Sequence, residues 1–317
     1  MEALRALPSC AELVRAGTQR LRAAGIETAQ LDAEVLLASA LGTDRAGLYA
    51  RVSAVPPPEA AARFTRSLER RARREPLAYI TGVQEFWSLP FAVNSSVLIP
   101  RPESELLVEI VCRLMGEACG GAEVRRCASM GSVAPQTDLR TSAPPHLRTP
   151  LSICDVGTGS GCLAVALARE LPAARVVALD VSAQALALAA CNAATHGVTE
   201  RIAFRAGDLF AALGAGERFD VIVSNPPYLR PGDVVSPELA FEPPEAFAAG
   251  ADGLDVIRRL IGAAAARLRR GGWLVMEIGS GQAEAVTAVA RRAGLATIAI
   301  EPDLAGIPRA LVARGGE

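Results

Sequence analysis

The sequence predicts an α/β fold, in which a doubly wound sheet follows a smaller N-terminal helical domain and a β-hairpin-like connector. Two observations carry this prediction. From residue 151 onward, short apolar runs alternate with amphipathic stretches of helical period. Before residue 76, apolar residues recur only at helical spacing. We therefore divide the chain into a helical domain (1–75), a connector (76–105) and a sheet domain (106–317).

The helical domain is expected to contain three or four helices. Ser9 and Glu12 have the spacing of a capping box, in which each side chain accepts a hydrogen bond from the other residue's backbone. Gly25 ends the first helical run, as glycine often does. Three consecutive prolines open the last helix, which closes in arginines. Arginine outnumbers Asp and Glu in this domain, which fits either a solvated helix face or a surface that docks an acidic partner.

Two segments lack the helical period. Residues 76–105 combine β-forming residues with turn residues, which favours a hairpin. Residues 120–149 are rich in Gly, Pro, Ser and Thr, which predicts a disordered surface insertion with His146 in solvent.

The sheet domain is expected to contain seven buried strands separated by helices, one of which spans 254–272. Because the strands are apolar throughout, both faces of the sheet should be covered. Ligands of such sheets bind at the carboxyl ends of the strands. The expected strands are 151–156, 175–181, 201–208, 219–225, 273–279, 296–302 and 308–314.

Composition excludes several kinds of mechanism. All 33 basic residues are arginine, so the chain has no lysine for a Schiff base or a phosphate-binding loop. The two histidines and the cysteine spacing do not form a metal site, so we expect no metal. A net charge of −1 argues against binding nucleic acid by charge alone. The sequence shows neither a membrane-spanning run nor a secretory signal, and a cytoplasmic protein with reduced thiols is expected.

A glycine-rich loop, DVGTGSG (155–161), follows the first expected strand. Gly157, Gly159 and Gly161 let the backbone approach a ligand closely, and the following helix offers free N–H groups. Asp180 ends the second strand, where an acidic residue can accept hydrogen bonds from ribose hydroxyls. This pattern predicts a cofactor that contains a nucleoside. Its G-x-G-x-G spacing differs from that of dinucleotide sites, and a purely turn-forming role for the glycines is the alternative.

The fourth strand ends in Asn225-Pro226-Pro227-Tyr228. The prolines stiffen this stretch in an extended conformation. The side-chain oxygen of Asn225 and the carbonyl of Pro226 are two acceptors that suit a planar NH₂ group, and the ring of Tyr228 can cover its face. The sequence therefore predicts a clamp for an amide or amino group, with an ordinary proline turn as the alternative.

The glycine loop, Asp180 and NPPY, in this order, resemble class I S-adenosylmethionine-dependent methyltransferases, whose sheet is Rossmann-like. Three further motifs resemble the bacterial protein-(glutamine) N5-methyltransferases that modify peptide chain release factors: EPLAYITG-x-x-EFW (75–87), VLIPRPESE (97–105) and FEPPEAF (241–247). The resemblance runs from about residue 10 to the C-terminal end. The segment 120–149 is longer than the usual link of that family.

The resemblance implies S-adenosylmethionine as cofactor, S-adenosylhomocysteine as product and no metal. It implies that residues of the glycine loop hold the methionine and ribose end of the cofactor, namely Gly157, Thr158, Gly159, Ser160 and Gly161. It further implies that Asp180 takes the ribose hydroxyls, that Asp208 and Leu209 border the adenine, and that Asn225 adjoins the cofactor.

The implied substrate is the glutamine of a Gly-Gly-Gln motif in a release factor. Asn225, Pro226, Pro227 and Tyr228 would bind its amide, with Asn225 and Tyr228 as catalytic residues. Since a sulfonium methyl group is already a strong electrophile, this chemistry needs orientation of the amide nitrogen more than it needs a base. Neither a nucleic acid nor a membrane is expected as a partner.

Three other interpretations compete. A ribosomal-protein glutamine methyltransferase or a DNA or RNA amino-group methyltransferase could use the same clamp, and a non-catalytic module could dock onto a translation partner. Only 4% of residues are aromatic, which is few for a protein that stacks on flipped bases. The sequence assigns no role to Arg101 or Glu103, and Glu242 either anchors a substrate loop or caps a helix.

Overall fold

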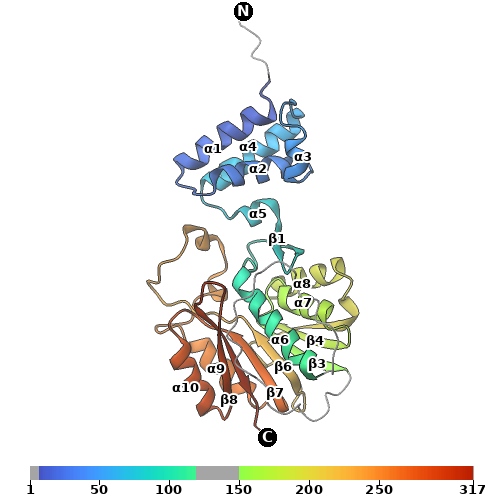
Figure 1. Cartoon of the computed structure of the whole chain (residues 1–317), viewed down its shortest axis with the longest axis vertical. Helices are drawn as coiled ribbons and strands as arrows, with labels where there is room; N and C mark the ends of the chain where they lie inside the picture. The colour runs from blue at the N-terminus through green and yellow to red at the C-terminus, as the bar shows by residue number, and fades with distance from the viewer. Residues whose placement is uncertain (1–6, 119–149, 317) are drawn as a thin grey trace, which may run out of the picture. The chain divides into compact units, whose positions relative to one another are not determined.

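The computed structural model describes residues 7–118 and 150–316, so the expected insertion at 120–149 lies outside the described residues. The chain forms two units, which we describe separately (Figure 1). The helical unit comprises Met1–Gln84, Val93–Ser95 and Val234–Glu242. The sheet unit comprises Glu85–Ala92, Ser96–Asp233 and Pro243–Glu317.

The helical unit packs its helices around an apolar core that includes Leu21, Leu37 and Phe64. The capping box is confirmed, because Glu12 accepts a hydrogen bond from the backbone N–H of Ser9 at 2.7 Å and the Ser9 hydroxyl accepts one in return. The helices are α1 (Cys10–Ala23), α2 (Ala29–Ala40), α3 (Arg45–Tyr49), α4 (Pro58–Ala72) and α5 (Leu77–Thr81).

Helix α5 lies where the sequence favours a hairpin. Pro76 precedes the helix with a φ of −54°, and Gly82 ends it in the left-handed conformation at 78°. Proline and glycine thus delimit one helical turn before the hairpin begins. The hairpin itself is shorter than expected and consists of β1 (Val83–Phe86) and β2 (Leu89–Ala92).

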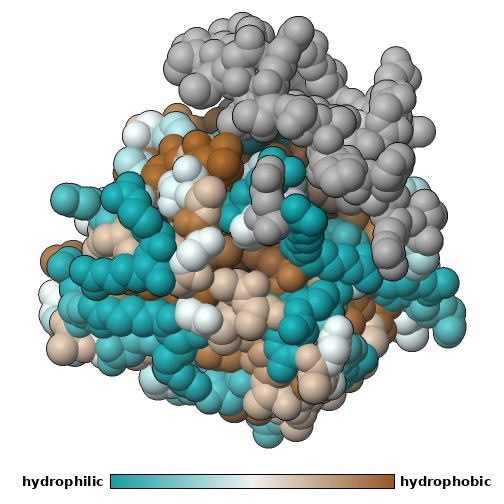
Figure 2. Space-filling view, turned by 90° about the horizontal axis from the view of Figure 1, so that it is seen from below, coloured by the Kyte–Doolittle hydropathy of each residue, from teal (hydrophilic) through white to brown (hydrophobic). Residues whose placement is uncertain are grey.

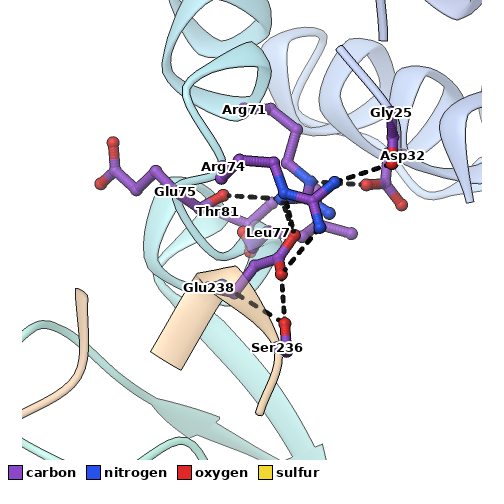
Figure 3. Close-up of polar contacts among 9 residues, drawn as sticks. All are labelled: Gly25, Asp32, Arg71, Arg74, Glu75, Leu77, Thr81, Ser236 and Glu238. Atoms are coloured by element: carbon purple, nitrogen blue, oxygen red, sulfur yellow. Dashed lines mark hydrogen bonds and ion pairs between the residues drawn. The ribbon is translucent and has the colours of Figure 1, made fainter. Parts of the chain in front are cut away.

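A segment from much later in the chain belongs to the helical unit. It carries the 3₁₀ helix η3 (Pro237–Phe241), which Arg71 of α4 contacts through Glu238. Arg71 donates hydrogen bonds to Asp32 of α2 at 2.6 Å and to Glu238 of η3 at 2.9 Å. Both Arg71 and Asp32 are buried, so the ion pairs connect α2, α4 and η3 inside the unit (Figure 3).

A second arginine strengthens the attachment of η3. Arg74 lies 3.2 Å from the carboxylate of Glu238, which also accepts a hydrogen bond from the hydroxyl of Ser236 (Figure 3). Burial opposes the charged form of Glu238, but the hydrogen bonds from Ser236 and Arg71 outweigh it and hold the pKa of this carboxyl below its usual value. Glu238 is therefore ionised around neutral pH.

The sheet unit contains a seven-stranded sheet in the order β5-β4-β3-β6-β7-β9-β8. Strands β3 to β7 are parallel, and β9 runs antiparallel to its neighbours β7 and β8. The α/β class and the seven strands are as predicted. The strands are β3 (Leu151–Val156), β4 (Ala174–Asp180), β5 (Ile202–Ala206), β6 (Phe219–Ser224), β7 (Leu268–Glu277), β8 (Ala296–Pro302) and β9 (Pro308–Arg314).

Helices cover both faces of the sheet, as the apolar strands predict (Figure 1). Along β6, Val221 and Val223 face the core that includes α6 and α7, whereas Ile222 faces the core that includes α9 and α10. The helices are α6 (Glu105–Ala118), α7 (Cys162–Glu170), α8 (Ala183–Thr195), α9 (Asp255–Ala264) and α10 (Ala283–Arg292), with short 3₁₀ turns η1 (Pro102–Ser104), η2 (Thr199–Arg201) and η4 (Pro244–Ala246).

One expected boundary is wrong. The helix predicted over 254–272 ends at Ala264, and β7 begins already at Leu268. Leu268 pairs with Phe219 of β6, and Arg269 donates to the carboxylate of Asp220 at 2.6 Å. Pairing with β6 therefore overrides the local helical period of this segment.

The exterior of the molecule mixes polar and apolar residues. On the face shown in Figure 2, hydrophilic side chains border a central area of intermediate and hydrophobic residues. Within residues 7–118 and 150–316, no helix combines the length and the apolar character needed to cross a bilayer.

Candidate active site

The predicted motifs meet where the sheet reverses its winding. Strands β3 and β6 are neighbours although β4 and β5 lie between them in the chain, so β3 and β6 flank the switch point. The register pairs Asp155 of β3 with Val223 of β6. The glycine loop after β3 and the NPPY stretch after β6 therefore leave the sheet side by side.

The glycine loop has a backbone that other residues adopt only with strain. Gly157, Gly159 and Gly161 have φ angles of 75°, 54° and 81°. A Cβ added at Gly157 or Gly159 would meet nothing within 4 Å, so the space beside this backbone is open to a ligand. At Gly161 the added atom would lie 2.9 Å from Cβ of Ala189, so here glycine permits α8 to pack against the start of α7.

Asp155 and Thr158 form a buried pair at the base of the loop. The hydroxyl of Thr158 donates to Oδ2 of Asp155 at 2.6 Å. The other carboxylate oxygen, Oδ1, is buried and has no hydrogen-bond partner among the described residues. Burial raises the pKa of Asp155 to about 7. An unpaired buried oxygen beside an open backbone fits a polar or cationic group of a cofactor.

Asp180 holds the glycine loop in place. Its Oδ2 accepts from the backbone N–H of Gly159 at 2.8 Å, and its Oδ1 accepts from that of Ser182 at 2.9 Å. Each carboxylate oxygen can accept a further hydrogen bond, so the residue can still receive hydroxyl groups of a sugar. Ser160, the remaining polar residue of the loop, is buried, and its carbonyl accepts from the amide of Asn192 at 2.8 Å.

The loop after β5 places Asp208 and Leu209 near Asp180. The N–H of Gly207 donates to the carbonyl of Asp180 at 2.9 Å. Leu209 has a φ of 50°, a conformation that costs free energy in a leucine and is frequent at binding sites. The side chain of Asp208 is exposed and pairs with Arg259 of α9.

The NPPY stretch is held by two residues to which the sequence assigned no role. Nδ2 of Asn225 donates to the hydroxyl of Ser104 at 2.9 Å. The hydroxyls of Ser104 and Tyr228 donate to the two carboxylate oxygens of Glu277, at 2.5 Å and 3.1 Å. Pro226 is buried between the partly buried Asn225 and Tyr228. Asn225 and Tyr228 of the NPPY stretch are therefore part of a connected polar network.

Glu277 is 1% exposed and ends β7, next to the end of β6. Burial raises its pKa, against the hydrogen bonds from Ser104 and Tyr228. The pKa of Tyr228 is likewise raised, by burial and then by the charge of Glu277. A charged residue at the carboxyl end of an apolar parallel strand is a signal that could have found Glu277 from the sequence.

The sequence points less clearly to Ser104, because this residue lies between charged residues in the motif VLIPRPESE. Within η1, Ser104 is buried whereas Glu103 is exposed. In the helical unit, Glu242 is buried and forms the C-cap of η3, with its N–H donating to Leu239. Arg101 precedes η1 as its N-cap residue, with no capping hydrogen bond from its side chain.

Two family models match this chain. Residues 12–82 match the PrmC N-terminal domain, and residues 144–242 match the methyltransferase small domain. The first match runs from within α1 to the residue after α5, and the second covers the glycine loop, Asp180 and NPPY.

Relatives match over nearly the whole chain. The release factor glutamine methyltransferase of Geobacter sulfurreducens is 41% identical over 92% of this chain and 92% of its own length. That of Cereibacter sphaeroides is 40% identical over 96% of this chain and 98% of its own length. The crystal structure of a methyltransferase from Pyrococcus furiosus matches 78% of this chain and 99% of its own, with 15% identity and a TM-score of 0.50, and shares the fold. The chain belongs to the release factor glutamine methyltransferase family.

Proposed function

We propose that this protein methylates the side-chain amide nitrogen of the glutamine in the Gly-Gly-Gln motif of a peptide chain release factor, with S-adenosylmethionine as methyl donor. The observation that carries the proposal is the juxtaposition of the open glycine loop and the Asn225 clamp at the β3/β6 switch point. The names of the relatives support the choice of a release factor as substrate. Such a substrate would place the reaction in the cytoplasm.

The residues present fit the cofactor. Gly157 and Gly159 leave open space beside the backbone, Asp155 offers an unpaired oxygen, and Asp180 has acceptor capacity for ribose hydroxyls. Leu209 and Asp208 would border the adenine. When bound, S-adenosylmethionine supplies a methyl group on a sulfonium sulfur; this group passes to the amide nitrogen, S-adenosylhomocysteine remains, and the amide proton leaves to water.

The clamp performs the difficult part of this reaction, which is to present a poorly nucleophilic nitrogen. The lone pair of an amide nitrogen is delocalised into its carbonyl group, so the nitrogen is weakly nucleophilic and reacts only from above or below the plane of the group. Two acceptors in the plane, Oδ1 of Asn225 and the carbonyl of Pro226, would fix both N–H groups. Orientation of this kind can lower a barrier by several kcal/mol, and the same acceptors stabilise positive charge that develops on nitrogen.

The proposal is tested with a methyl-labelled cofactor and purified release factors. We expect label in the wild-type release factor, mapped by mass spectrometry to the glutamine of Gly-Gly-Gln. A release factor with that glutamine changed to alanine is the control and should accept no label. Full labelling of this control, or labelling of a ribosomal protein, DNA or RNA in place of the release factor, would refute the proposal and favour one of the competing substrates.

A further inference from the structure

Four side chains from separate parts of the chain converge at the clamp. Ser104 ends η1, Asn225 and Tyr228 follow β6, and Glu277 ends β7. The hydrogen bonds run from Asn225 to Ser104, from Ser104 to Glu277 and from Tyr228 to Glu277. Ser104 and Glu277 are 3% and 1% exposed, so water does not readily replace these bonds. Neither residue lies in the NPPY motif.

The chemistry of the groups fixes the direction of each hydrogen bond. When Glu277 is ionised it can only accept, so the hydroxyl of Ser104 then donates its proton to this carboxylate. The oxygen of Ser104 is then free to accept, and only the NH₂ end of the Asn225 amide can donate to it. The Oδ1 end of Asn225 therefore points away from Ser104, and among the described residues no donor reaches it.

We propose that Glu277 and Ser104 are positioning residues that orient the Asn225 amide so that its oxygen faces the substrate. The proposal rests on the proposed function, because it explains how the clamp presents an acceptor to an amide N–H. Glu277 also fixes the hydroxyl of Tyr228 and hence its ring. One buried carboxylate thus orients both the polar wall and the aromatic wall of the clamp.

The substitution Glu277→Gln tests this mechanism, because it keeps size and shape but exchanges one acceptor for a donor. With its NH₂ group toward Ser104, glutamine would reverse that hydrogen bond, and Asn225 would turn its NH₂ group toward the substrate. With the NH₂ group toward Tyr228, glutamine would displace the ring hydroxyl as donor. Either arrangement damages one wall of the clamp, although glutamine fills the same volume and can still form one hydrogen bond to each of Ser104 and Tyr228.

We expect turnover of Glu277→Gln and Ser104→Ala to fall roughly 10- to 100-fold, by analogy with the loss of residues that orient metal ligands. The affinity for S-adenosylmethionine, measured by titration, should stay within about twofold, since the glycine loop and Asp180 are unchanged. Glu301→Gln is the matched control. Glu301 lies on β8 of the same sheet, is partly buried, and pairs with Arg113 of α6, outside the clamp. This control should keep wild-type turnover.

The pH profile separates positioning from a merely structural role. Protonated Glu277 can donate to Ser104 and reverse the network, so turnover at saturating cofactor should rise with pH through the pKa of Glu277. The charged groups that also act on Glu277 are Arg309 of β9 and Glu103 of η1, with opposite effects. In Glu277→Gln this acid limb should disappear. Wild-type turnover in Glu277→Gln, or an unchanged acid limb, would overturn the proposal.

A measurement without substrate tests the Ser104–Glu277 network independently of the proposed function. In protein labelled with ¹⁵N-asparagine, the side-chain amide signals of Asn225 should shift in Ser104→Ala, while those of Asn192, which bonds to Ala92 and Ser160, should not. Unchanged Asn225 signals would refute the network. If the signals shift but the wild-type enzyme labels no release factor, the network stands and the proposed substrate falls.

Discussion

Asp180 accepts a hydrogen bond from the backbone N–H of Gly159 at 2.8 Å, which ties the end of β4 to the glycine loop of β3. The carboxylate that we expect to receive ribose hydroxyls therefore also shapes the loop that we expect to hold the rest of the cofactor. A substitution at Asp180 should therefore affect cofactor binding both through the lost ribose contacts and through the altered glycine loop.

Replacement of Asp180 by alanine should weaken binding of S-adenosylmethionine by roughly 1.5 to 3 kcal/mol, since hydrogen bonds to a charged acceptor are lost. Isothermal titration measures this loss. Asp180→Asn is the control, because it keeps one acceptor oxygen and should lose less affinity. An unchanged affinity in folded Asp180→Ala would remove Asp180 from the cofactor site.

Asn225→Ala should reduce turnover on the order of 10²-fold or more, by analogy with the loss of one preorganised polar group. The affinity for the cofactor should change far less, because the glycine loop and Asp180 stay intact. Turnover is measured with labelled cofactor and a release factor. An equal loss in turnover and in cofactor affinity would show that Asn225 supports the cofactor more than the substrate.

Tyr228→Phe should lower stability as well as turnover. If the ring only covered the substrate, removal of its hydroxyl would have little effect. In the structure, however, this hydroxyl donates a hydrogen bond to the buried carboxylate of Glu277. Removal of a hydrogen bond to a charged group costs roughly 1.5 to 3 kcal/mol. Urea unfolding at constant slope tests this expectation, and an unshifted midpoint would show that the bond contributes nothing.

The buried carboxyl of Asp155 should make stability and cofactor binding depend on pH. Its pKa is raised from 3.8 to about 7, so the folded protein holds a proton that the unfolded chain releases. Between about pH 4 and pH 7 the free energy of unfolding should therefore fall as pH rises, by up to about 1.4 kcal/mol per unit. Asp155→Asn should flatten this slope in thermal unfolding across that range.

Cofactor binding should show the opposite trend, because a cationic group next to Asp155 favours the ionised carboxylate. Affinity for S-adenosylmethionine is expected to increase with pH up to about 7, with release of protons on binding. Titration in buffers of different ionisation enthalpy measures this release. Binding without any proton release at pH 6 would place the cationic group away from Asp155.

The attachment of η3 should be sensitive to one arginine. Arg71→Met leaves Asp32 buried without its partner, which typically costs 3 to about 5 kcal/mol for a broken buried pair. Glu238→Gln should cost less. In the double variant the losses should not add, because both substitutions break the same contact. Additive losses would show that Arg71 acts through Asp32 alone.

Acid should weaken the ion pair between Glu238 and Arg71. The pKa of Glu238 lies below its usual 4.5, so its contribution to stability is complete above about pH 4.5 and is lost as pH falls through the lowered pKa. Proteolysis within 234–242 should therefore speed up in acid in the wild type, and Glu238→Gln should show fast cleavage at all pH values.

Local signals predicted most of the elements. The Ser9–Glu12 capping box and the apolar run of β6 depend on residues close in the chain, and both are present. The start of β7 was misplaced because its pairing with Phe219 is a tertiary contact. The hydrogen bond between Ser104 and Glu277 could not be predicted for the same reason, because it joins residues 173 positions apart and no periodicity encodes it.

The helical unit is not one continuous stretch of chain, since Val234–Glu242 returns to it from within the sheet unit. Cutting the gene after residue 84 would consequently yield two incomplete pieces. The first would leave Arg71 and Asp32 without Glu238, and the second would expose Leu239, which is buried in the intact chain. Chimeras between relatives should therefore exchange η3 together with the N-terminal helices, and evolution faces the same restriction when it recombines these modules.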